Sequence, residues 1–509
     1  MAGIFSLERE NGVMERDLIL ALDIGTSSLK ASVVDKNGEI LCSEKAEYET
    51  RHPSAGISEQ DPMDWWKGTC KAVSAMIASK NDIANRIAVI GVSGHMLGCI
   101  PVDKEGIPLY PALIHSDSRA VKQFRQIQNS VGEDTIYQMS GNVLDARASL
   151  CKMLWFQQEK EDIYKKTYKF LQAKDFLVSR LTDNYDCTDF SDASHGELID
   201  IQKKCYDSSL YQELSLDISK LPELHAGIEI VGFLTKQSAL SLGLTDGIPV
   251  IAGGGDGACA DIGAGNVKEG DIYCSLGTTA WISKCVKKPY FDPHKRTFNI
   301  MSLDGEHSSM FGTMQSAGGA LTWAMGILGV SDLDKWNSLA AEINPGSDGL
   351  IFLPYLDGER SPIFDASARG CFFGLSLAHT KSHFMRAVFE GVAYALNSIF
   401  EVFKEQGNVE KMKIIGGGAN SELWKQILTD VWEIPLAVLN TSAGDSCSLG
   451  AAAVAGTAVG LFSSLQEATK YIRIKKIIQP SRNKGEYKKY FSVYQELYPN
   501  TVCQMHKLQ

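Results

Sequence analysis

Two stretches of the chain share one arrangement: a strand-like run, a Gly-Thr turn rich in hydroxyls, and a second strand-like run. The first is LILALDIGTSSLKASVVD (18–35), and the second is DIYCSLGTTAWISKCV (271–286). Their turn glycines, Gly25 and Gly277, are separated by about half of the chain. Because each half contains the same unit near its start, the sequence predicts a duplicated domain.

The two turns have the composition of an anion site. Glycine allows a tight turn and a close approach by a ligand. The backbone N–H groups, together with the hydroxyls of Thr26, Ser27 and Thr278, form a concavity rich in donors that suits phosphate oxygens. Taken singly, each turn is also compatible with an ordinary hairpin. Taken together, we expect Thr26, Ser27, Gly277 and Thr278 to hold the phosphates of one ATP molecule from two sides.

The remainder of the chain alternates strand-like and helix-like patterns. Helical spacing of apolar residues appears at 63–79, 151–166 and 383–406, and KMKIIGGGANSELWKQILTDVW (411–432) is typical of a strand, a glycine turn and a helix. The run LGAAAVAGTAVGLF (449–462) is too short to span a bilayer, and we expect a buried, closely packed helix there. This alternation predicts α/β domains that bind ligands at a sheet edge or in an interdomain cleft.

Charge and cysteine content narrow the class of partner. The net charge is −11, which argues against nucleic acid or an anionic membrane as the main partner. The 12 cysteines include no CxxC pair, so we expect a reduced, cytoplasmic protein rather than a secreted disulfide scaffold.

In IAGGGDGACADIGAG (251–265), the carboxylate of Asp256 follows three glycines and precedes a run of small residues. It fits either a turn cap or a general base that accepts a proton from a substrate hydroxyl. For the second hypothesis, the glycines at 253–255 and Gly257 are expected to leave room for the substrate. Asp23, at the end of the first buried strand, is a candidate ligand for Mg²⁺, because hard cations prefer carboxylate oxygen.

Two further glycine segments are candidates for the nucleoside. Gly417 and Gly418 precede the helix expected after residue 420, with Asn420 as its expected N-cap. Gly318 and Thr322 lie in SAGGALTW (316–323), which has the same pattern. Both segments are also compatible with plain strand-to-helix turns.

These motifs, in this order, resemble the FGGY carbohydrate kinases, and within them the xylulokinase branch. The resemblance is carried by ALDIGTSSLKASVVD, EQDPMDWW, GGGDGACADIGAG, SLGTT, PYLDGERSPIFDASARGCFFGLSLAHT and IIGGGANSELWKQILTDV. It implies an α/β fold of two actin-like (ribonuclease H-like) domains, each with a central mixed sheet flanked by helices. We expect a leader over 1–16, an N-terminal kinase domain over 17–258 and a C-terminal one over 259–509.

The resemblance also assigns roles to residues. It implies Asp256 as general base, Asp23 as the Mg²⁺-linked acid, and ATP as phosphate donor. Contacts to ATP phosphates are implied for Thr26, Gly277 and Thr278, and contacts at or near adenosine for Gly417, Gly418 and Asn420. In the sugar-contacting segments SGHMLG and HSDSR, it implies His95, Met96 and Asp117 as substrate contacts.

The sugar-contacting segments depart from the xylulokinase pattern. His95 and Leu97 replace its Gln and His, His115–Ser116 replaces Trp-Asn, and Gly257 replaces the Asn after the catalytic acid. Because polar contacts select between similar sugars, D-xylulose is the leading substrate, and another ketopentose, gluconate or a tetritol stays open. A different class, an ATP-driven binding module of the actin and heat-shock-protein kind, is the remaining alternative, and a homodimer is left open.

Overall fold

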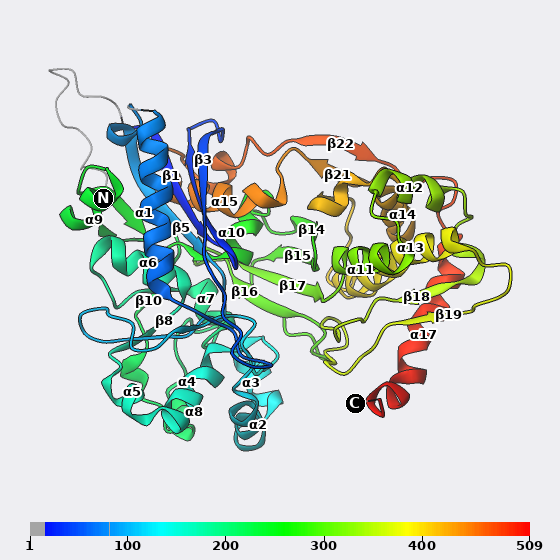
Figure 1. Ribbon diagram of the computed structural model, residues 1–509, viewed down its shortest axis with the longest axis horizontal. Coiled ribbons are helices and arrows are strands. Elements are labelled where there is room, and N and C mark those ends of the chain that lie inside the picture. The colour runs from blue at the N-terminus through cyan, green and yellow to red at the C-terminus, as the bar shows by residue number, and fades with distance from the viewer. Residues whose placement is uncertain (1–15, 81, 509) are drawn as a thin grey trace.

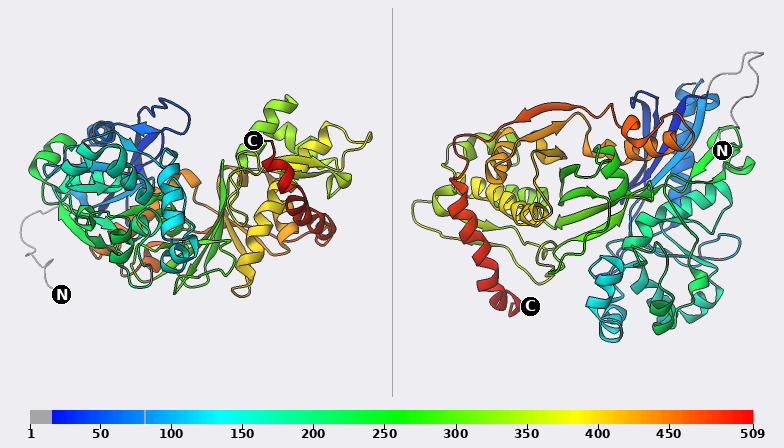
Figure 2. Two further views of the ribbon diagram at one scale, coloured as in Figure 1. Left: turned by 90° about the horizontal axis from the view of Figure 1, so that it is seen from below. Right: turned by 180° about the vertical axis from the view of Figure 1, so that it is seen from behind.

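The computed structural model describes residues 16–80 and 82–508, so the expected leader at 1–16 lies outside the described residues except for Arg16. Two seven-stranded mixed sheets dominate this part of the chain. Figure 2 shows two lobes side by side, one from the first half of the chain and one mainly from the second. The α/β class expected from the sequence is therefore confirmed.

The first sheet is built around the meander that follows Arg16. Its strands lie in the order β3 (Ile40–Glu47), β2 (Ser28–Val34), β1 (Leu18–Ile24), β5 (Ile87–Gly94), β12 (Pro249–Ile251) and β11 (Ile230–Phe233), and β13 (Gly254–Gly255) pairs with β5. The meander is antiparallel, whereas β5, β12 and β13 run parallel to β1.

The second sheet repeats this plan. Its strands lie in the order β16 (Phe298–Met301), β17 (Ser308–Met314), β15 (Ala280–Val286), β14 (Ile272–Leu276), β20 (Met412–Ile415), β21 (Leu436–Leu439) and β22 (Ile474–Ile478). The run β17–β15–β14–β20–β21 has the same directions as β3–β2–β1–β5–β12, antiparallel up to the central strand and parallel beyond it. This match bears out the duplication that the two Gly-Thr turns predict.

The side chains of β1 alternate in direction and meet helices on both faces of the first sheet. Leu18, Leu20 and Leu22 pack with α1 (Pro62–Ser79), α6 (Ala173–Thr182) and α9 (Lys236–Leu242). Ile19 and Ala21 point to the other face and pack with α10 (Asp256–Gly263) and α15 (Ala443–Ala458). Successive side chains of a strand point to opposite faces of the sheet. Because helices cover both faces here, β1 is buried on both sides.

Helix α15 is the buried, small-residue helix expected at 449–462, although it begins earlier in the sequence. It lies against α10 and against β1 and β5 of the first sheet, although it follows β21 of the second (Figure 1). The boundary predicted between residues 258 and 259 falls inside α10 and stays a prediction.

The second sheet has its own helical cover. A large apolar cluster joins it to α11 (Gly318–Leu328), α12 (Leu333–Ala341), α13 (Lys381–Lys404), α14 (Glu422–Trp432) and the C-terminal α17 (Tyr487–His506). The helix expected at 151–166 is divided into α4 (Ser149–Glu159) and α5 (Glu161–Lys166), because the backbone at Lys160 leaves the helical region.

A smaller, mostly helical layer covers one end of the first lobe. It contains α2 (Val121–Ser130), α3 (Glu133–Ser140), α4, α5, α7 (Phe190–His195) and α8 (Ser208–Glu213). Short strand pairs join the loops there: β4 (Glu59–Gln60) with β7 (Ala112–Leu113), β6 (Ile100–Val102) with β8 (Lys169–Leu171), and β9 (Thr188–Asp189) with β10 (Leu224–His225). In the second lobe, β18 (Ile351–Leu353) pairs with β19 (Cys371–Phe373).

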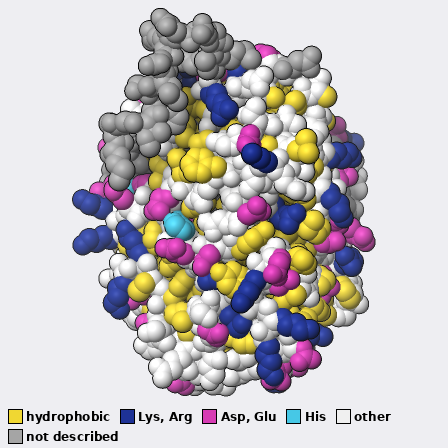
Figure 3. Space-filling model, turned by 90° about the vertical axis from the view of Figure 1, so that its left-hand side faces the viewer, with side chains coloured by type: hydrophobic (Ala, Val, Ile, Leu, Met, Phe, Trp, Pro, Cys, Tyr) yellow, Lys and Arg dark blue, Asp and Glu magenta, His cyan; other side chains and the backbone are white. Residues whose placement is uncertain are grey.

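No described helix is long and apolar enough to cross a membrane. Figure 3 shows both signs of charge interspersed over one face of the molecule.

Candidate active site

Three parallel strands of the first sheet end together beside two carboxylates. In register, Asp23 of β1 lies opposite Ser93 of β5, and Ser93 lies opposite Gly254 of β13. The next residue of β13, Gly255, pairs with Gly94, and the chain then turns into α10 with Asp256 as its first residue. Ligands of α/β sheets bind outside the carboxyl ends of parallel strands, so this edge is the natural position for a site.

Burial raises the proton affinity of both carboxylates. The pKa of Asp256 is raised to about 7, chiefly by burial and then by the negative charge of Asp23. The pKa of Asp23 is also raised by burial, against the lowering effects of the neighbouring Ser93 and of the positive charge of Lys30. A carboxylate with a pKa near neutrality is a better proton acceptor than an ordinary one at physiological pH.

Asp23 has the chemistry of a cation ligand. Its Oδ1 atom is buried and has no hydrogen-bond partner in the described structure. Mg²⁺ is usually held by one or two carboxylates plus substrate phosphates, so a site with few protein ligands fits this ion. No group of three or more His, Cys, Asp or Glu side chains that could hold a metal occurs among the described residues.

The three glycines at 253–255 do not leave the space that the sequence suggests, whereas a Cβ on Gly257 would meet its nearest neighbours only at 3.7 Å. A Cβ atom on Gly253 would lie 2.1 Å from the carbonyl oxygen of Val92, and one on Gly254 would lie 2.1 Å from a methyl carbon of Leu303. On Gly255 it would lie 2.5 Å from Met96. The expectation that 253–255 are bare for the substrate is therefore wrong, because neighbouring backbone and side chains already fill that space.

The first Gly-Thr turn presents its hydroxyls outward. Thr26 and Ser27 are exposed, while the backbone behind them is held by protein contacts. The N–H of Gly25 donates to the carbonyl of Ser28 at 3.1 Å, and Gln60 Nε2 donates to the carbonyl of Thr26 at 2.6 Å. A turn that is fixed from behind and open in front suits a ligand with many acceptor oxygens.

The second Gly-Thr turn is joined to the start of α11. The N–H of Gly318 donates to the carbonyl of Gly277 at 2.9 Å, and the N–H of Gly319 donates to the carbonyl of Thr278, also at 2.9 Å. A Cβ on Gly318 would lie 2.6 Å from that Gly277 oxygen, so glycine is required for this approach. Thr322 is exposed on the next turn of α11, and its hydroxyl donates to the Gly318 carbonyl at 3.0 Å.

The glycine triplet after β20 (416–418) packs against the end of β14, next to the second Gly-Thr turn. A Cβ on Gly416 would lie 2.4 Å from the carbonyl oxygen of Leu276, the residue before the second Gly-Thr turn, and one on Gly418 would lie 2.5 Å from the Leu276 side chain. Gly417 and Asn420 are exposed beside it. The structure thus brings together, at the end of β14, the second Gly-Thr turn, the start of α11 and the glycine triplet.

One detail of this segment differs from the sequence prediction. Asn420 is not the N-cap of the following helix, because it ends a short 3-10 turn over Gly417–Asn420. The cap of α14 is Ser421, whose side chain accepts a hydrogen bond from the N–H of Trp424 at 3.0 Å. The exposed Asn420 side chain is therefore not used for capping.

Two neutral histidines lie near each other: the buried His95 in the loop after β5, and the half-buried His115 in the loop after β7. His95 is 2 % exposed, and neither of its ring nitrogens has a hydrogen-bond partner in the described residues. Burial, His115 and Lys152 lower the pKa of His95 to about 3. The rings of His95 and His115 are 5.8 Å apart between centroids, and Trp65 lies edge-on to His95 at 5.3 Å.

These neutral rings suit an uncharged polyhydroxy ligand. Each neutral imidazole offers one donor and one acceptor nitrogen, the pair of functions that a sugar hydroxyl matches. A buried polar group without a partner is costly, so the two unpartnered nitrogens of His95 fit the hydroxyls of such a ligand. Met96, the next residue, packs on Gly255 and so forms part of the wall beside Asp256.

Asp117 is engaged in contacts within the protein. It is fully buried, and its carboxylate accepts from the N–H of Ser58 at 2.8 Å and from Arg119 Nε at 2.9 Å. Arg119 in turn donates to Glu59 at 2.8 Å. In this conformation Asp117 holds the loop together, and the structure does not bring it to Asp256 as a free contact.

Sequence reasoning missed several charged residues around the histidines. Lys152 is fully buried and donates to the carbonyls of Leu97 and Ile114 at 2.7 and 2.8 Å. Burial lowers the pKa of Lys152 to about 8. Arg147 and Arg360 also act on His115, whose pKa is lowered to about 4 by burial, then Lys152, Arg147 and Arg360. No short motif marks Lys152 or Arg147. Arg360 lies in the segment GERSP (358–362), whose sequence alone does not indicate a role for the arginine.

Comparison with known proteins identifies the family. The model of the FGGY family of carbohydrate kinases, N-terminal domain, matches residues 18–263, and that of the C-terminal domain matches 272–459. The chain belongs to the FGGY family of carbohydrate kinases. This membership makes it a sugar kinase that uses ATP, as the motifs predict.

Individual relatives extend over nearly the whole kinase. It is 32% identical to the xylulose kinase of Lactococcus lactis, over 96% of this chain and 98% of the relative. It is 29% identical to a gluconokinase of Bacillus subtilis, over 89% of this chain and 90% of that protein. The crystal structure of ligand-bound xylulose kinase from Lactobacillus acidophilus superposes with a TM-score of 0.92 at 25% identity, covering 97% of this chain and all of that one. The two-domain, actin-like fold is thereby confirmed.

Proposed function

We propose that this kinase transfers the γ-phosphate of ATP to a hydroxyl of D-xylulose, with Asp256 as the general base. The observation that carries the proposal is the half-buried Asp256 at the start of α10, beside Asp23 and with a pKa raised to about 7. The hydroxyl proton passes to the Asp256 carboxylate while a bond forms between the sugar oxygen and the γ-phosphorus. The bond to the β,γ-bridging oxygen breaks, and ADP leaves.

The nucleotide assignments follow from the exposed turns. Thr26, Ser27, Gly277 and Thr278 are proposed to donate hydrogen bonds to phosphate oxygens. Gly318, Thr322, Gly417, Gly418 and Asn420 are proposed to line the nucleoside. The support for this second set is that α11 and the glycine triplet both pack on the end of β14. Mg²⁺ held beside Asp23 would supply positive charge to the phosphates.

The sugar is proposed to lie against His95 and Met96, with Asp117 acting from behind the loop. The orphaned nitrogens of His95 would pair with sugar hydroxyls away from the reacting one. Such contacts distinguish one sugar from its epimer, because the wrong sugar leaves them unpaired. Location in the cytoplasm and a homodimeric state stay predictions from the sequence.

Gluconate is the second candidate, and the charge around His115 favours it. Arg147 and Arg360 both lower the pKa of His115, so a substrate carboxylate near that ring would find cationic neighbours. Arg147 is paired with Asp145, whereas Arg360 Nε is buried without a hydrogen-bond partner in the described residues.

The test is turnover of an Asp256→Asn variant, followed by a substrate panel. Asn keeps the size of the side chain but cannot accept the proton, so we expect phosphoryl transfer to be abolished while ATP binding, measured by titration calorimetry, is retained. A variant that keeps even about a tenth of wild-type turnover would refute the base assignment. Coupled ADP-release assays with D-xylulose, its ketopentose epimers, gluconate and a tetritol then identify the substrate. ATP hydrolysis that no sugar changes would instead favour an ATP-driven binding module.

A further inference from the structure

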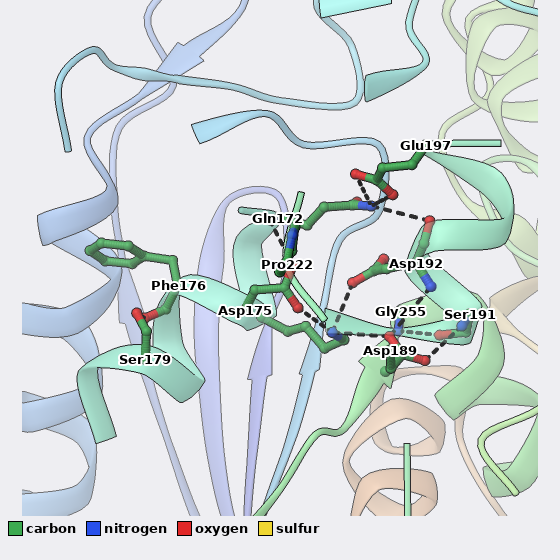
Figure 4. Close-up of polar contacts among 12 residues, drawn as sticks. Gln172, Asp175, Phe176, Ser179, Asp189, Ser191, Asp192, Glu197, Pro222 and Gly255 are labelled. Carbon is green, nitrogen blue, oxygen red and sulfur yellow. Dashed lines mark hydrogen bonds and ion pairs between the residues drawn. The ribbon is translucent and has the colours of Figure 1, made fainter. Parts of the chain in front are cut away.

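A buried lysine joins three aspartates directly behind the catalytic edge. Lys174, near the start of α6, is fully buried. Its Nζ pairs with Asp175, lies 3.0 Å from Asp189 and lies 3.4 Å from Asp192. Figure 4 shows these three carboxylates, from α6 and from the β9–α7 segment, converging on one point. The phosphoryl-transfer mechanism makes no direct use of this cluster.

One branch of the cluster leads to Asp256 through a chain of hydrogen bonds. Asp189 caps α7, and its Oδ2 accepts from the N–H of Ser191 at 2.7 Å. The Ser191 hydroxyl oxygen accepts from the N–H of Gly255 at 3.0 Å (Figure 4). Gly255 immediately precedes Asp256, so two hydrogen bonds and one ion pair connect Lys174 to the residue before the proposed base.

The backbone of Lys174 also supports the strand between the two site carboxylates. A Cβ on Gly94 would lie 2.9 Å from the backbone nitrogen of Lys174, so α6 begins in direct contact with the end of β5. Gly94 pairs with Ile24 on one side and with Gly255 on the other. Lys174 therefore contacts the strand that sets the spacing of Asp23 and Asp256.

Charge keeps this cluster in one state near neutral pH. Burial alone would lower the pKa of Lys174, but Asp175, Asp189 and Asp192 outweigh it and raise the pKa well above its usual value. Burial raises the pKa of Asp192 well above its usual range, against the lowering effect of the positive charge of Lys174. A charged lysine held by aspartates in a dry environment makes a rigid contact, because separating the ions leaves an uncompensated buried charge.

We propose that Lys174, Asp189 and Ser191 are positioning residues that fix the backbone at Gly255 and thereby aim the Asp256 carboxylate at the substrate hydroxyl. This inference rests on the proposed function, because it assumes Asp256 as the base. None of the three is proposed to touch the substrate. Their effect is on the fraction of time that Asp256 spends in the reactive geometry, and a displacement of about 1 Å is enough to slow such a reaction by up to about 100-fold.

Two matched pairs of variants test the inference. Ser191→Ala removes the acceptor of the Gly255 N–H, and its control is Ser179→Ala, which removes an equally buried hydroxyl that donates to the Phe176 carbonyl within α6. Asp189→Asn breaks the ion pair to Lys174, and its control is Asp192→Asn. Asp192 also contacts Lys174, but its carboxyl oxygens have no hydrogen-bond partner among the described residues. Its side chain therefore does not connect Lys174 to Gly255.

For Ser191→Ala and Asp189→Asn we expect kcat to fall on the order of tenfold, with sugar and ATP KM values close to those of their controls. The melting temperatures of Ser191→Ala and Ser179→Ala should be similar, because each variant loses one buried hydrogen bond. In an Asp256→Asn background, adding Ser191→Ala should cause no further loss of turnover.

The outcomes separate this inference from the proposed function. If Asp256→Asn stays active, the base assignment fails, whatever Ser191 does. If Asp256→Asn is inactive but Ser191→Ala and Asp189→Asn keep the kcat of their controls within about a factor of two, the positioning inference alone is overturned. A fall in kcat that only follows a fall in melting temperature, in test and control alike, also overturns it.

Discussion

Adding one methyl group between α10 and α15 should destabilise the kinase although alanine is the better helix former. The two helices touch backbone to backbone: a Cβ on Gly263 of α10 would lie 1.9 Å from the carbonyl oxygen of Ser446, and one on Gly450 of α15 would lie 1.9 Å from that of Cys259. Helix α15 has little freedom to withdraw, because a Cβ on Gly91 of β5 would lie 2.5 Å from the carbonyl oxygen of Ala451.

The magnitude follows from these distances. The added carbon of Gly450→Ala falls about 1.5 Å short of ordinary van der Waals contact, and overpacking of this kind costs about 1–3 kcal/mol. The gain from replacing glycine inside a helix is about 0.5–1 kcal/mol. Gly326 of α11 provides the matched control, since a Cβ there would meet no described heavy atom within 4 Å and its replacement by Ala should realise that gain.

Thermal melting without ligands compares the two variants directly. Because the helix gain is common to both variants, their free energies of unfolding should differ by the overpacking cost of about 1–3 kcal/mol. For a chain of 509 residues, this corresponds to roughly 1–3 °C between Gly450→Ala and Gly326→Ala. Turnover of Gly450→Ala should also fall, because α10 begins with Asp256 and the thiol of Cys447 in α15 donates to the Asp256 carbonyl at 3.5 Å. A Gly450→Ala variant that melts at or above the wild-type temperature would refute the close packing on which this reasoning depends.

Two further predictions concern protons. Because only ionised Asp256 accepts the hydroxyl proton and its pKa is about 7, kcat/KM for the sugar should rise roughly tenfold between about pH 6 and about pH 8, and a flat profile would contradict the base assignment. Burial, followed by Asp175, raises the pKa of Glu197 from 4.5 to about 8, so its contribution to stability is complete below about pH 4.5 and is lost as the pH rises through about 8. In thermal scans at a series of pH values, the melting temperature of Glu197→Gln should therefore fall less with rising pH than that of the wild type. Parallel curves of melting temperature against pH would exclude Glu197 as the cause of the fall.

Motif order and strand periodicity were enough to predict the framework from the sequence. The apolar runs of β1 and β14, each followed by a Gly-Thr turn, identified the duplicated halves, because a strand that is buried on both faces leaves an almost continuous apolar signal. Local sequence also indicated Asp23, as an acid at the end of an apolar run, and Asp256, as an acid that follows three glycines. Both signals can be recognised without knowledge of the tertiary contacts. Family membership followed from these segments, and the comparisons confirm it.

Contacts between distant segments were decided by the tertiary structure. The positions 253–255 require glycine because a Cβ there would clash with Val92, Leu303 and Met96. No local sequence pattern links these residues to the glycines. The sequence likewise gave no sign that α15 crosses to the first sheet or that Lys174 lies behind Asp256. A chain reports the periodicity of its own elements, but which surfaces meet, and hence which charges are buried together, depends on the packing of parts that are hundreds of residues apart.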